Sequence, residues 1–266
     1  ETLRRWPCRA AMHFAAFIEA GESMREPMRY FANNVGKTIA FLEALRAAGV
    51  DRVVFSSTAA VYAPRPEPLT EEAPVGPVNV YGETKWMVER ILGWLHRTQG
   101  LRVAVLRYFN AGGATAARGE DHRPESHLIP NILAVAMGRR PYVEIYGTDY
   151  PTRDGTCVRD YIHVADLARA HLLMLEALEE RPWLVYNVGT GVGYTVREVL
   201  AVCRAVTGHP IPAVEGPRRP GDAPILVASA EALRQDWGWA PQHDLWDIVA
   251  SAWRWMQAHP WGYGVG

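Results

Sequence analysis

The sequence contains few cysteines, and their placement excludes a disulfide framework. Cys8, Cys157 and Cys203 are the only three among 266 residues, and they lie far apart along the chain. Their separations match none of the common metal-ligand spacings, so we expect no bound metal. An odd number of distant cysteines is typical of a reducing compartment, which predicts a cytoplasmic protein.

Long apolar runs and an excess of charge of either sign are also missing. No stretch approaches the roughly 18 consecutive apolar residues that a membrane helix requires. The 28 Lys and Arg residues nearly balance 29 Asp and Glu residues, so the formal net charge is -1. Such a chain has no overall positive field to attract nucleic acid or an anionic membrane. We expect neither partner, and any anionic ligand must be bound by local positive side chains.

What the sequence does contain is an alternation of strand-like and helix-like segments. With 48% hydrophobic and 21% charged residues, the chain can bury a sizeable core. Alternating segments predict an α/β fold with a parallel sheet, and a proline-rich stretch over 64–77 predicts a surface loop. Strands are expected at 11–15, 52–57, 101–108, 142–146 and 184–188, and helices at 27–48, 81–97, 128–137, 164–178 and 195–206 and near Ala230 and Leu245.

Lysine is scarce, which makes the position of one lysine informative. The chain has only Lys37 and Lys85, and Lys85 follows Tyr81 by four residues at the start of a predicted helix. Residues four apart on a helix share a face, so the two side chains are expected to lie close together. A nearby ammonium group lowers the pKa of a phenol, which would let Tyr81 act as a base near neutral pH.

Three hydroxyl residues end the predicted strand at 52–57. Ser56, Ser57 and Thr58 lie at its carboxyl end, where ligands bind in open α/β sheets. Small polar residues also end many strands without any function, and for each residue alone that is the simpler interpretation. As a set beside Tyr81 and Lys85, they favour a catalytic site.

These features together resemble the extended short-chain dehydrogenase/reductase superfamily, and more specific runs resemble the UDP-glucose (UDP-galactose) 4-epimerase family. The resemblance extends from about His13 to the end of the chain, and the Val-Arg-Asp-Tyr-Ile-His-Val run is highly characteristic. The matching runs are His13–Ala16, Gly21–Ser23, Asn33–Val35, Phe55–Tyr62, Leu106–Asn110, Asp149–Pro151, Asp154–Thr156, Val158–Val164 and Tyr186–Gly189, with His259-Pro260 and Gly262-Tyr263 near the end.

The resemblance implies a fold, a cofactor and a reaction. The fold is a Rossmann-like doubly wound parallel sheet with a smaller mixed α/β substrate-binding domain. Residues 1–108 would form an incomplete NAD-binding domain and 109–266 mainly a UDP-sugar-binding domain, with about 160–190 returning to the first sheet. The cofactor would be tightly held NAD, and the reaction would interconvert UDP-galactose and UDP-glucose through a 4-keto intermediate.

The resemblance also assigns roles to individual residues. Thr58, Tyr81 and Lys85 would be catalytic. Arg159 and Arg219 would clamp the diphosphate, as suits a chain of near-neutral charge, although an ion pair between Arg159 and Asp160 is the structural alternative. Cofactor contacts would come from Phe14, Ala15, Ala16, Asn33, Ser56, Ser57, Tyr81, Lys85, Tyr108 and Phe109, and substrate contacts from Thr58, Tyr81, Asn110, His127, Leu128, Ile145, Tyr146, Arg159, Arg219 and Asp222.

The sequence departs from the family pattern in three places. The family's glycine-rich Gly-x-x-Gly-x-x-Gly turn, which holds the cofactor diphosphate, is not present, and we expect about 60 residues of that half-domain to be missing. We therefore expect this chain not to hold NAD well. Ile18 stands where a lysine is common, and Leu226 stands where some members carry a tyrosine that narrows the sugar pocket.

Several alternatives remain. A 4-epimerase of another UDP-sugar, an N-acetylhexosamine or a glucuronate, shares the same residues. A nucleotide-sugar 4,6-dehydratase needs an Asp-Glu pair after the catalytic threonine, whereas Ala59 and Ala60 follow Thr58 here. A non-catalytic nucleotide-binding remnant is the alternative from another class. The resemblance also predicts a homodimer through the helices at 27–48 and 81–97, where Trp86, Met87 and Trp94 would supply apolar contact.

Overall fold

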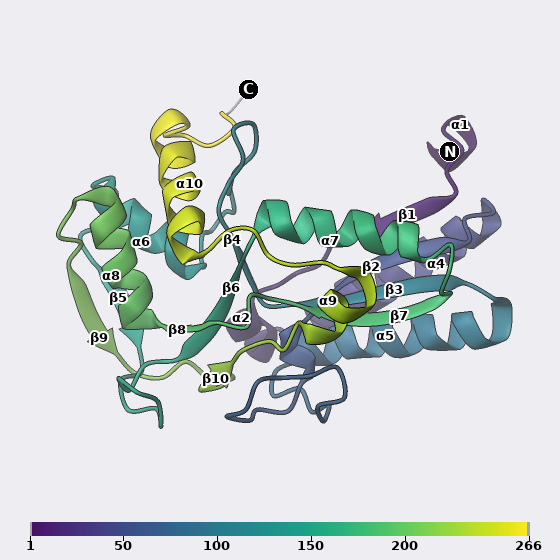
Figure 1. Ribbon diagram of the computed structural model, residues 1–266, viewed down its shortest axis with the longest axis horizontal. Coiled ribbons are helices and arrows are strands. Elements are labelled where there is room, and N and C mark those ends of the chain that lie inside the picture. The colour runs from purple at the N-terminus through teal and green to yellow at the C-terminus, as the bar shows by residue number, and fades with distance from the viewer. Residues whose placement is uncertain (1, 265–266) are drawn as a thin grey trace.

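The computed structural model describes residues 2–264 and contains a parallel four-stranded sheet in its larger half (Figure 1). The strand order is β1-β2-β3-β7, with bounds Ala10–His13, Arg52–Thr58, Arg102–Tyr108 and Trp183–Val188. Every neighbouring pair in this sheet is parallel. The predicted α/β class with a parallel sheet is confirmed.

Helices cover both faces of this sheet. On one face, α4 (Lys37–Ala47) and α5 (Val80–Gln99) bury Leu42, Leu45, Val88 and Leu92 against the strands. On the other face, α7 (Val164–Ala177) packs Met174 against the strands beside α9 (Glu231–Trp237). In Figure 1, α7 and α5 run along opposite sides of the strands. The sheet is therefore doubly wound, as the sequence predicts.

The smaller half is built around β6 (Val158–His163). This strand lies between β10 (Ile225–Leu226) and β4 (Asn110–Gly112), both parallel to it, and also pairs antiparallel with β8 (Gly193–Thr195). A separate parallel pair joins β5 (Val143–Tyr146) to β9 (Ala213–Gly216). A second core forms where α6 (Leu128–Ala136), α8 (Val196–Thr207) and α10 (Leu245–Ala258) pack together.

The N-terminal helical segment is less regular than the sequence predicts. The expected helix at 27–48 is divided into α3 (Pro27–Tyr30), a π-helical turn (Phe31–Gly36) and α4. Two further short helices, α1 (Thr2–Arg5) and α2 (Ala20–Arg25), were not predicted. The wide turn includes the buried Asn34, whose side chain bonds to the chain before α2, and sequence periodicity cannot register such a contact.

The other predicted helices and strands agree with the structure to within about two residues at each end. The strands around β6 were missed because β6 carries Arg159, Asp160 and His163 rather than a continuous apolar run. The buried Asp160 carboxylate accepts hydrogen bonds from the main-chain N–H groups of Thr190, Gly191 and Ala228 and from the Thr190 hydroxyl.

Within residues 2–264, no helix has the length and apolarity needed to cross a membrane.

Candidate active site

The candidate site lies where parallel strands of the main sheet end. β1 ends at His13, and Thr58 at the end of β2 pairs in register with Tyr108 at the end of β3. Phe14, directly after β1, is 54% exposed. The carboxyl edge of an open parallel sheet is the usual place for a ligand. The fold therefore brings Phe14, Thr58 and Tyr108, which the sequence places far apart, to one edge.

The first turn of α5 is fixed tightly, and this positions Tyr81. The Asn79 side chain caps the helix by accepting from the N–H of Gly82 at 2.8 Å. The Ser23 hydroxyl accepts from the N–H of Tyr81 at 3.0 Å and donates to the Ala20 carbonyl at 2.6 Å. Two of the four otherwise unpaired N–H groups of this helix start are thus satisfied by side chains.

Gly82 permits a close approach between α5 and the end of β2. A Cβ atom at this position would collide with the carbonyl oxygen of Ala60. Ala60 belongs to the short 3₁₀ turn that follows Thr58, and the Thr58 hydroxyl accepts from the N–H of Ala60 at 3.2 Å. A residue without a side chain therefore lets the helix that carries Tyr81 contact the turn that carries Thr58.

Lys85 is buried beneath this edge. Lys85 is only 2% exposed, and its Nζ donates to the Ser56 carbonyl at 2.8 Å. Nζ also lies 5.0 Å from the centre of the Phe55 ring. Burial lowers the pKa of Lys85 from 10.5 to about 8, and the charge of Glu89 opposes part of that shift. The lysine is therefore mainly protonated at neutral pH.

The electrostatics of Tyr81 differ from the expectation that Lys85 lowers its pKa. Burial raises the pKa of Tyr81 above its ordinary value, the neighbouring Tyr108 adds to the rise, and a hydrogen bond with Thr58 opposes it. Lys85 is not among the main influences on this pKa. The protein part of the site alone thus keeps the phenol neutral, and the expectation from spacing alone is wrong in this respect.

The serines of β2 point to opposite faces of the sheet, because side chains alternate along a strand. The Ser56 hydroxyl lies 2.8 Å from Nε2 of His171 on α7, and Phe14 packs on the same imidazole. The Ser57 hydroxyl instead donates to the buried Glu89 on α5. Ser56 thus remains a candidate cofactor contact, whereas the Ser57 side chain is occupied on the face turned toward α5.

The segment after β1 is held by Asn34, a residue that the sequence interpretation missed. The Asn34 side chain accepts from the N–H of Phe17 at 2.8 Å and donates to the Phe17 carbonyl at 2.9 Å. It also donates to the Thr84 hydroxyl on α5 at 3.1 Å. This clamp fixes the chain that follows the predicted cofactor residues Phe14, Ala15 and Ala16. Asn33 lies beside it and donates to Asn34 at 3.1 Å.

A second group of predicted residues meets near β6 and the arginine-rich loop. Asp222 lies between two guanidinium groups, with its carboxylate 3.8 Å from Arg159 and 2.9 Å from Arg219. The Arg219 guanidinium also stacks 4.9 Å from the centre of the Tyr146 ring. The structural alternative for Arg159, a pair with Asp160, is not observed because Asp160 bonds elsewhere. The fold thus assembles four predicted substrate residues from three distant segments.

The remaining predicted residues lie in mixed environments. Asn110 begins β4 and is exposed, and His127 is the N-cap of α6, which Leu128 begins. The side chains of Phe109 and Ile145 are buried in hydrophobic clusters.

The residues present fit NAD in part. The Lys85 ammonium has three N–H groups and donates one to the Ser56 carbonyl, so it can bind hydroxyl groups of a ribose. A diphosphate is usually held by a glycine-rich turn at a helix N-terminus, and the sequence contains no Gly-x-x-Gly-x-x-Gly run. We therefore assign this chain's residues only to the nicotinamide half of the cofactor.

Comparison with known proteins agrees with this geometry. The profile of the NAD dependent epimerase/dehydratase family matches residues 1–189. The UDP-glucose 4-epimerase of Streptomyces lividans is 50% identical over 253 residues, which cover 95% of this chain and 77% of that protein. The enzyme of the same name from Lacticaseibacillus casei is 48% identical, with 95% and 78% coverage.

Solved structures agree as well. A UDP-glucose-4-epimerase from Stenotrophomonas maltophila with bound NAD and formylated UDP-arabinopyranose has a TM-score of 0.92 and 41% identity, covering 97% of this chain and 79% of that one. The Bifidobacterium longum enzyme in complex with NAD+ and UDP has a TM-score of 0.95 and 38% identity, with 98% and 80% coverage. The chain therefore belongs to the NAD dependent epimerase/dehydratase family, among the UDP-glucose 4-epimerases.

Proposed function

We propose that this protein interconverts UDP-galactose and UDP-glucose by NAD-dependent 4-epimerisation. The observation that carries the proposal is the junction of Thr58, Tyr81 and Lys85 at the carboxyl edge of the sheet, in a chain 50% identical to a UDP-glucose 4-epimerase. The similar structures bound to NAD with UDP or a UDP-sugar support the same cofactor and substrate class.

The roles of the catalytic residues follow from their surroundings. Tyr81 takes the proton from the sugar 4-hydroxyl and returns it, and Thr58 holds the same oxygen by a hydrogen bond. When bound, NAD would accept the C4 hydrogen together with the electron pair of its bond and return both, and it would bring a positive charge to the site. Lys85 binds ribose hydroxyls and adds a second positive charge. Since burial raises the pKa of Tyr81 and Lys85 is not among the main influences on it, the positive charge that a bound cofactor would bring is what would make a phenolate accessible.

The nucleotide is held by the second group of residues. In the structure, the Asp222 carboxylate forms ion pairs with the guanidinium groups of Arg159 and Arg219. A planar guanidinium can exchange such a carboxylate for phosphate oxygens and bind them in a bidentate manner. Tyr146 supplies a ring beside Arg219 against which a base can stack. This arrangement supports Arg159 and Arg219 as the diphosphate clamps and Asp222 as a nucleoside contact.

Proton NMR of the purified chain with NAD and UDP-galactose tests the proposal. We expect the anomeric signal of UDP-glucose to appear with time. If no conversion occurs but the uridine signals broaden, the chain binds the substrate without turning it over, which would contradict the proposed activity of this chain and leave the substrate site in place. Absence of both would contradict the proposal.

The residue at position 226 supports a second candidate substrate class. Leu226 in β10 packs beside Phe109, at the position where some family members carry a tyrosine. A smaller side chain leaves room for an N-acetyl group. A UDP-Glc/GlcNAc 4-epimerase from Campylobacter jejuni is 37% identical, with a TM-score of 0.80. Turnover of UDP-N-acetylgalactosamine at a rate comparable to that of UDP-galactose is expected, and complete exclusion of the larger sugar would reject this candidate.

Replacement of Tyr81 separates the enzyme from a non-catalytic nucleotide-binding protein. Tyr81→Phe removes only the phenolic oxygen, so the epimerase should lose turnover by at least about a hundredfold with UDP affinity unchanged. The exposed Tyr142 provides the matched control, because Tyr142→Phe should leave turnover intact. Equal turnover of the Tyr81→Phe variant and the wild type would contradict the role of Tyr81.

The domain division, the assembly and the location are part of the proposal. We assign residues 1–108 and the returning segment at about 160–190 to the NAD-binding domain, because β7 pairs with β3, and most of 109–266 to the UDP-sugar-binding domain. A cytoplasmic location rests on the three free cysteines.

A homodimer through α4 and α5 is supported by the exposed side chains of Ile39 and Trp94. Trp86 and Met87 instead pack partly against the molecule's own core. Native mass measurement at micromolar concentration should show a dimer, and a monomer alone would reject it.

A further inference from the structure

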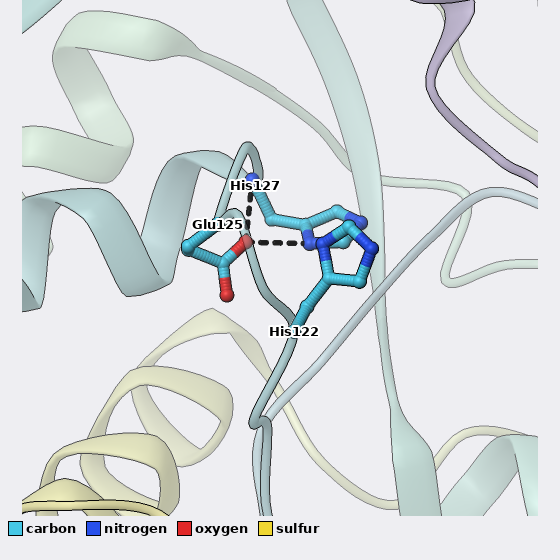
Figure 2. A group of neighbouring side chains, drawn as sticks. All are labelled: His122, Glu125 and His127. Carbon is cyan, nitrogen blue, oxygen red and sulfur yellow. Dashed lines mark hydrogen bonds and ion pairs between the residues drawn. The ribbon is translucent and has the colours of Figure 1, made fainter.

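Histidine and carboxylate side chains gather in the loop before α6. His122, Glu125 and His127 each offer one ligand atom, and these three atoms lie within 4.8 Å of one another. Figure 2 shows the two imidazole rings side by side, with the Glu125 carboxylate directed toward them. The proposed reaction uses neither His122 nor Glu125, so the cluster needs an explanation of its own.

A fourth group reaches the cluster from a distant part of the chain. Oε1 of Glu19, just before α2, lies 3.7 Å from Nδ1 of His122. Both atoms are inaccessible to solvent, and neither has a hydrogen-bond partner among the described residues. The separation is too long for a hydrogen bond, and buried polar atoms without partners are unfavourable.

The same separation suits two ligands of one ion. Zinc binds imidazole nitrogen and carboxylate oxygen at roughly 2.0–2.2 Å, so two ligands in a tetrahedral arrangement are about 3.4 Å apart. An ion between Glu19 and His122 would therefore satisfy both orphaned atoms with little movement of either side chain.

The other side of the cluster is already rigid. Oε1 of Glu125 accepts from the N–H groups of Ser126 at 2.8 Å and His127 at 2.7 Å, and lies 2.7 Å from Nδ1 of His127. These bonds fix the carboxylate and the imidazole before any ion arrives. Ligands held in place by such bonds lose little freedom on binding a metal.

We infer that Glu19, His122, Glu125 and His127 form a binding site for Zn²⁺ or a similar divalent transition metal. Imidazole ligands favour zinc over Mg²⁺ and Ca²⁺, which prefer oxygen ligands alone. The spacing of the cysteines predicted no metal, whereas these ligands come from residue 19 and from 122–127. The ion would join the loop before α6 to the chain that leads into α2, whose Ser23 holds the N–H of Tyr81.

Equilibrium dialysis of the metal-free 266-residue chain against ZnCl₂ tests this site. The measurements are made in a Cys8→Ser background, because the exposed thiol of Cys8 can bind zinc by itself. Glu19→Gln and His122→Gln each remove one ligand without touching a residue assigned to the UDP-sugar. His209→Gln, on an exposed histidine after α8, is the matched control. Tetrahedral coordination is followed by the visible absorption of Co²⁺ in place of zinc.

We expect one zinc ion per chain, with affinity reduced at least about tenfold in Glu19→Gln and in His122→Gln and unchanged in His209→Gln. Circular dichroism of the metal-free variants shows whether each is folded, and either folded variant suffices. No zinc bound by the Cys8→Ser protein, or equal affinity in all folded variants, would overturn the inference.

Discussion

The hydroxyl of Ser23 accepts a hydrogen bond from the main-chain N–H of Tyr81 at 3.0 Å. Ser23 is fully buried within the short helix α2, 58 residues before Tyr81 in the chain. The contact fixes the first turn of α5 against the segment that follows β1. Ser23 is thus a positioning residue, since it acts on the phenol through the main chain.

Ser23→Ala tests this role. We expect kcat to fall about tenfold with KM for UDP-galactose unchanged, because the phenol is displaced while the nucleotide contacts remain. The free energy of unfolding should fall by about 1 kcal/mol for the lost hydrogen bond. Ser23→Thr should restore kcat, and Thr98→Ala at the exposed far end of α5 is the control. A fall in stability without any change in kcat would reduce Ser23 to a structural role.

Gly82→Ala should disturb the junction of α5 with β2. The added methyl group meets the Ala60 carbonyl, so we expect the free energy of unfolding to fall by about 2 kcal/mol. A Cβ atom added at Gly93, on the same helix, would have the Arg97 guanidinium as its closest neighbour, at 3.3 Å. That guanidinium ends a flexible side chain, which can move aside. Gly93→Ala should therefore be neutral or stabilising, as alanine favours a helix. Urea denaturation of both variants makes the comparison, and equal effects would contradict the close approach.

The buried Lys85 predicts a dependence of stability on pH. Its pKa is lowered by burial to about 8 in the folded chain, against 10.5 for an exposed lysine. Between these values the unfolded chain keeps a proton that the folded chain has released, so stability should rise with pH, by on the order of 3 kcal/mol over the whole interval. Below pH 8 both states carry the proton and the full cost of burying the charge is present.

Lys85→Met and Lys37→Met, which replace the only two lysines, form a matched pair. Lys37 is exposed and bonds to Asn33. We expect Lys85→Met to be more stable than wild type at pH 7 and to lose the rise between pH 8 and 9.5, below the titration of the tyrosines. Lys37→Met should follow the wild type. If the stability of the wild type fell with pH relative to that of Lys85→Met over this interval, the predicted direction of the Lys85 pKa shift would be wrong.

Two adjacent arginines allow a sharp test of the diphosphate clamp. Arg219 contacts Asp222 and the Tyr146 ring, whereas Arg218 bonds to the exposed Asp149 at 2.6 Å. Arg219→Ala should weaken UDP binding about tenfold in isothermal titration calorimetry, because a charged bidentate contact is lost. Arg218→Ala should change the affinity less than about threefold. The reverse order of effects would move the clamp to Arg218.

Local patterns were enough for much of the fold. The strand at 52–57 and the helix at 81–97 appear as β2 and α5, because a buried apolar run and helical periodicity are properties of neighbouring residues. The roles of Thr58, Tyr81 and Lys85 came from their spacing and from resemblance to a family. No role was predicted for Ser23, Asn34 or Gly82, although Ser23 and Asn34 lie in runs that carry the resemblance.

The sequence by itself determined the α/β class, the family, and which hydroxyl, phenol and amine are available for chemistry. Only the tertiary structure decided that Ser57 faces Glu89, that Asp222 joins Arg159 to Arg219, and that Glu19 meets His122. Apart from the pair of Arg219 with Asp222, which are three positions apart, these contacts join residues 32 to more than 100 positions apart. Which residues meet across such separations depends on how the strands and helices pack, and no local periodicity encodes that packing.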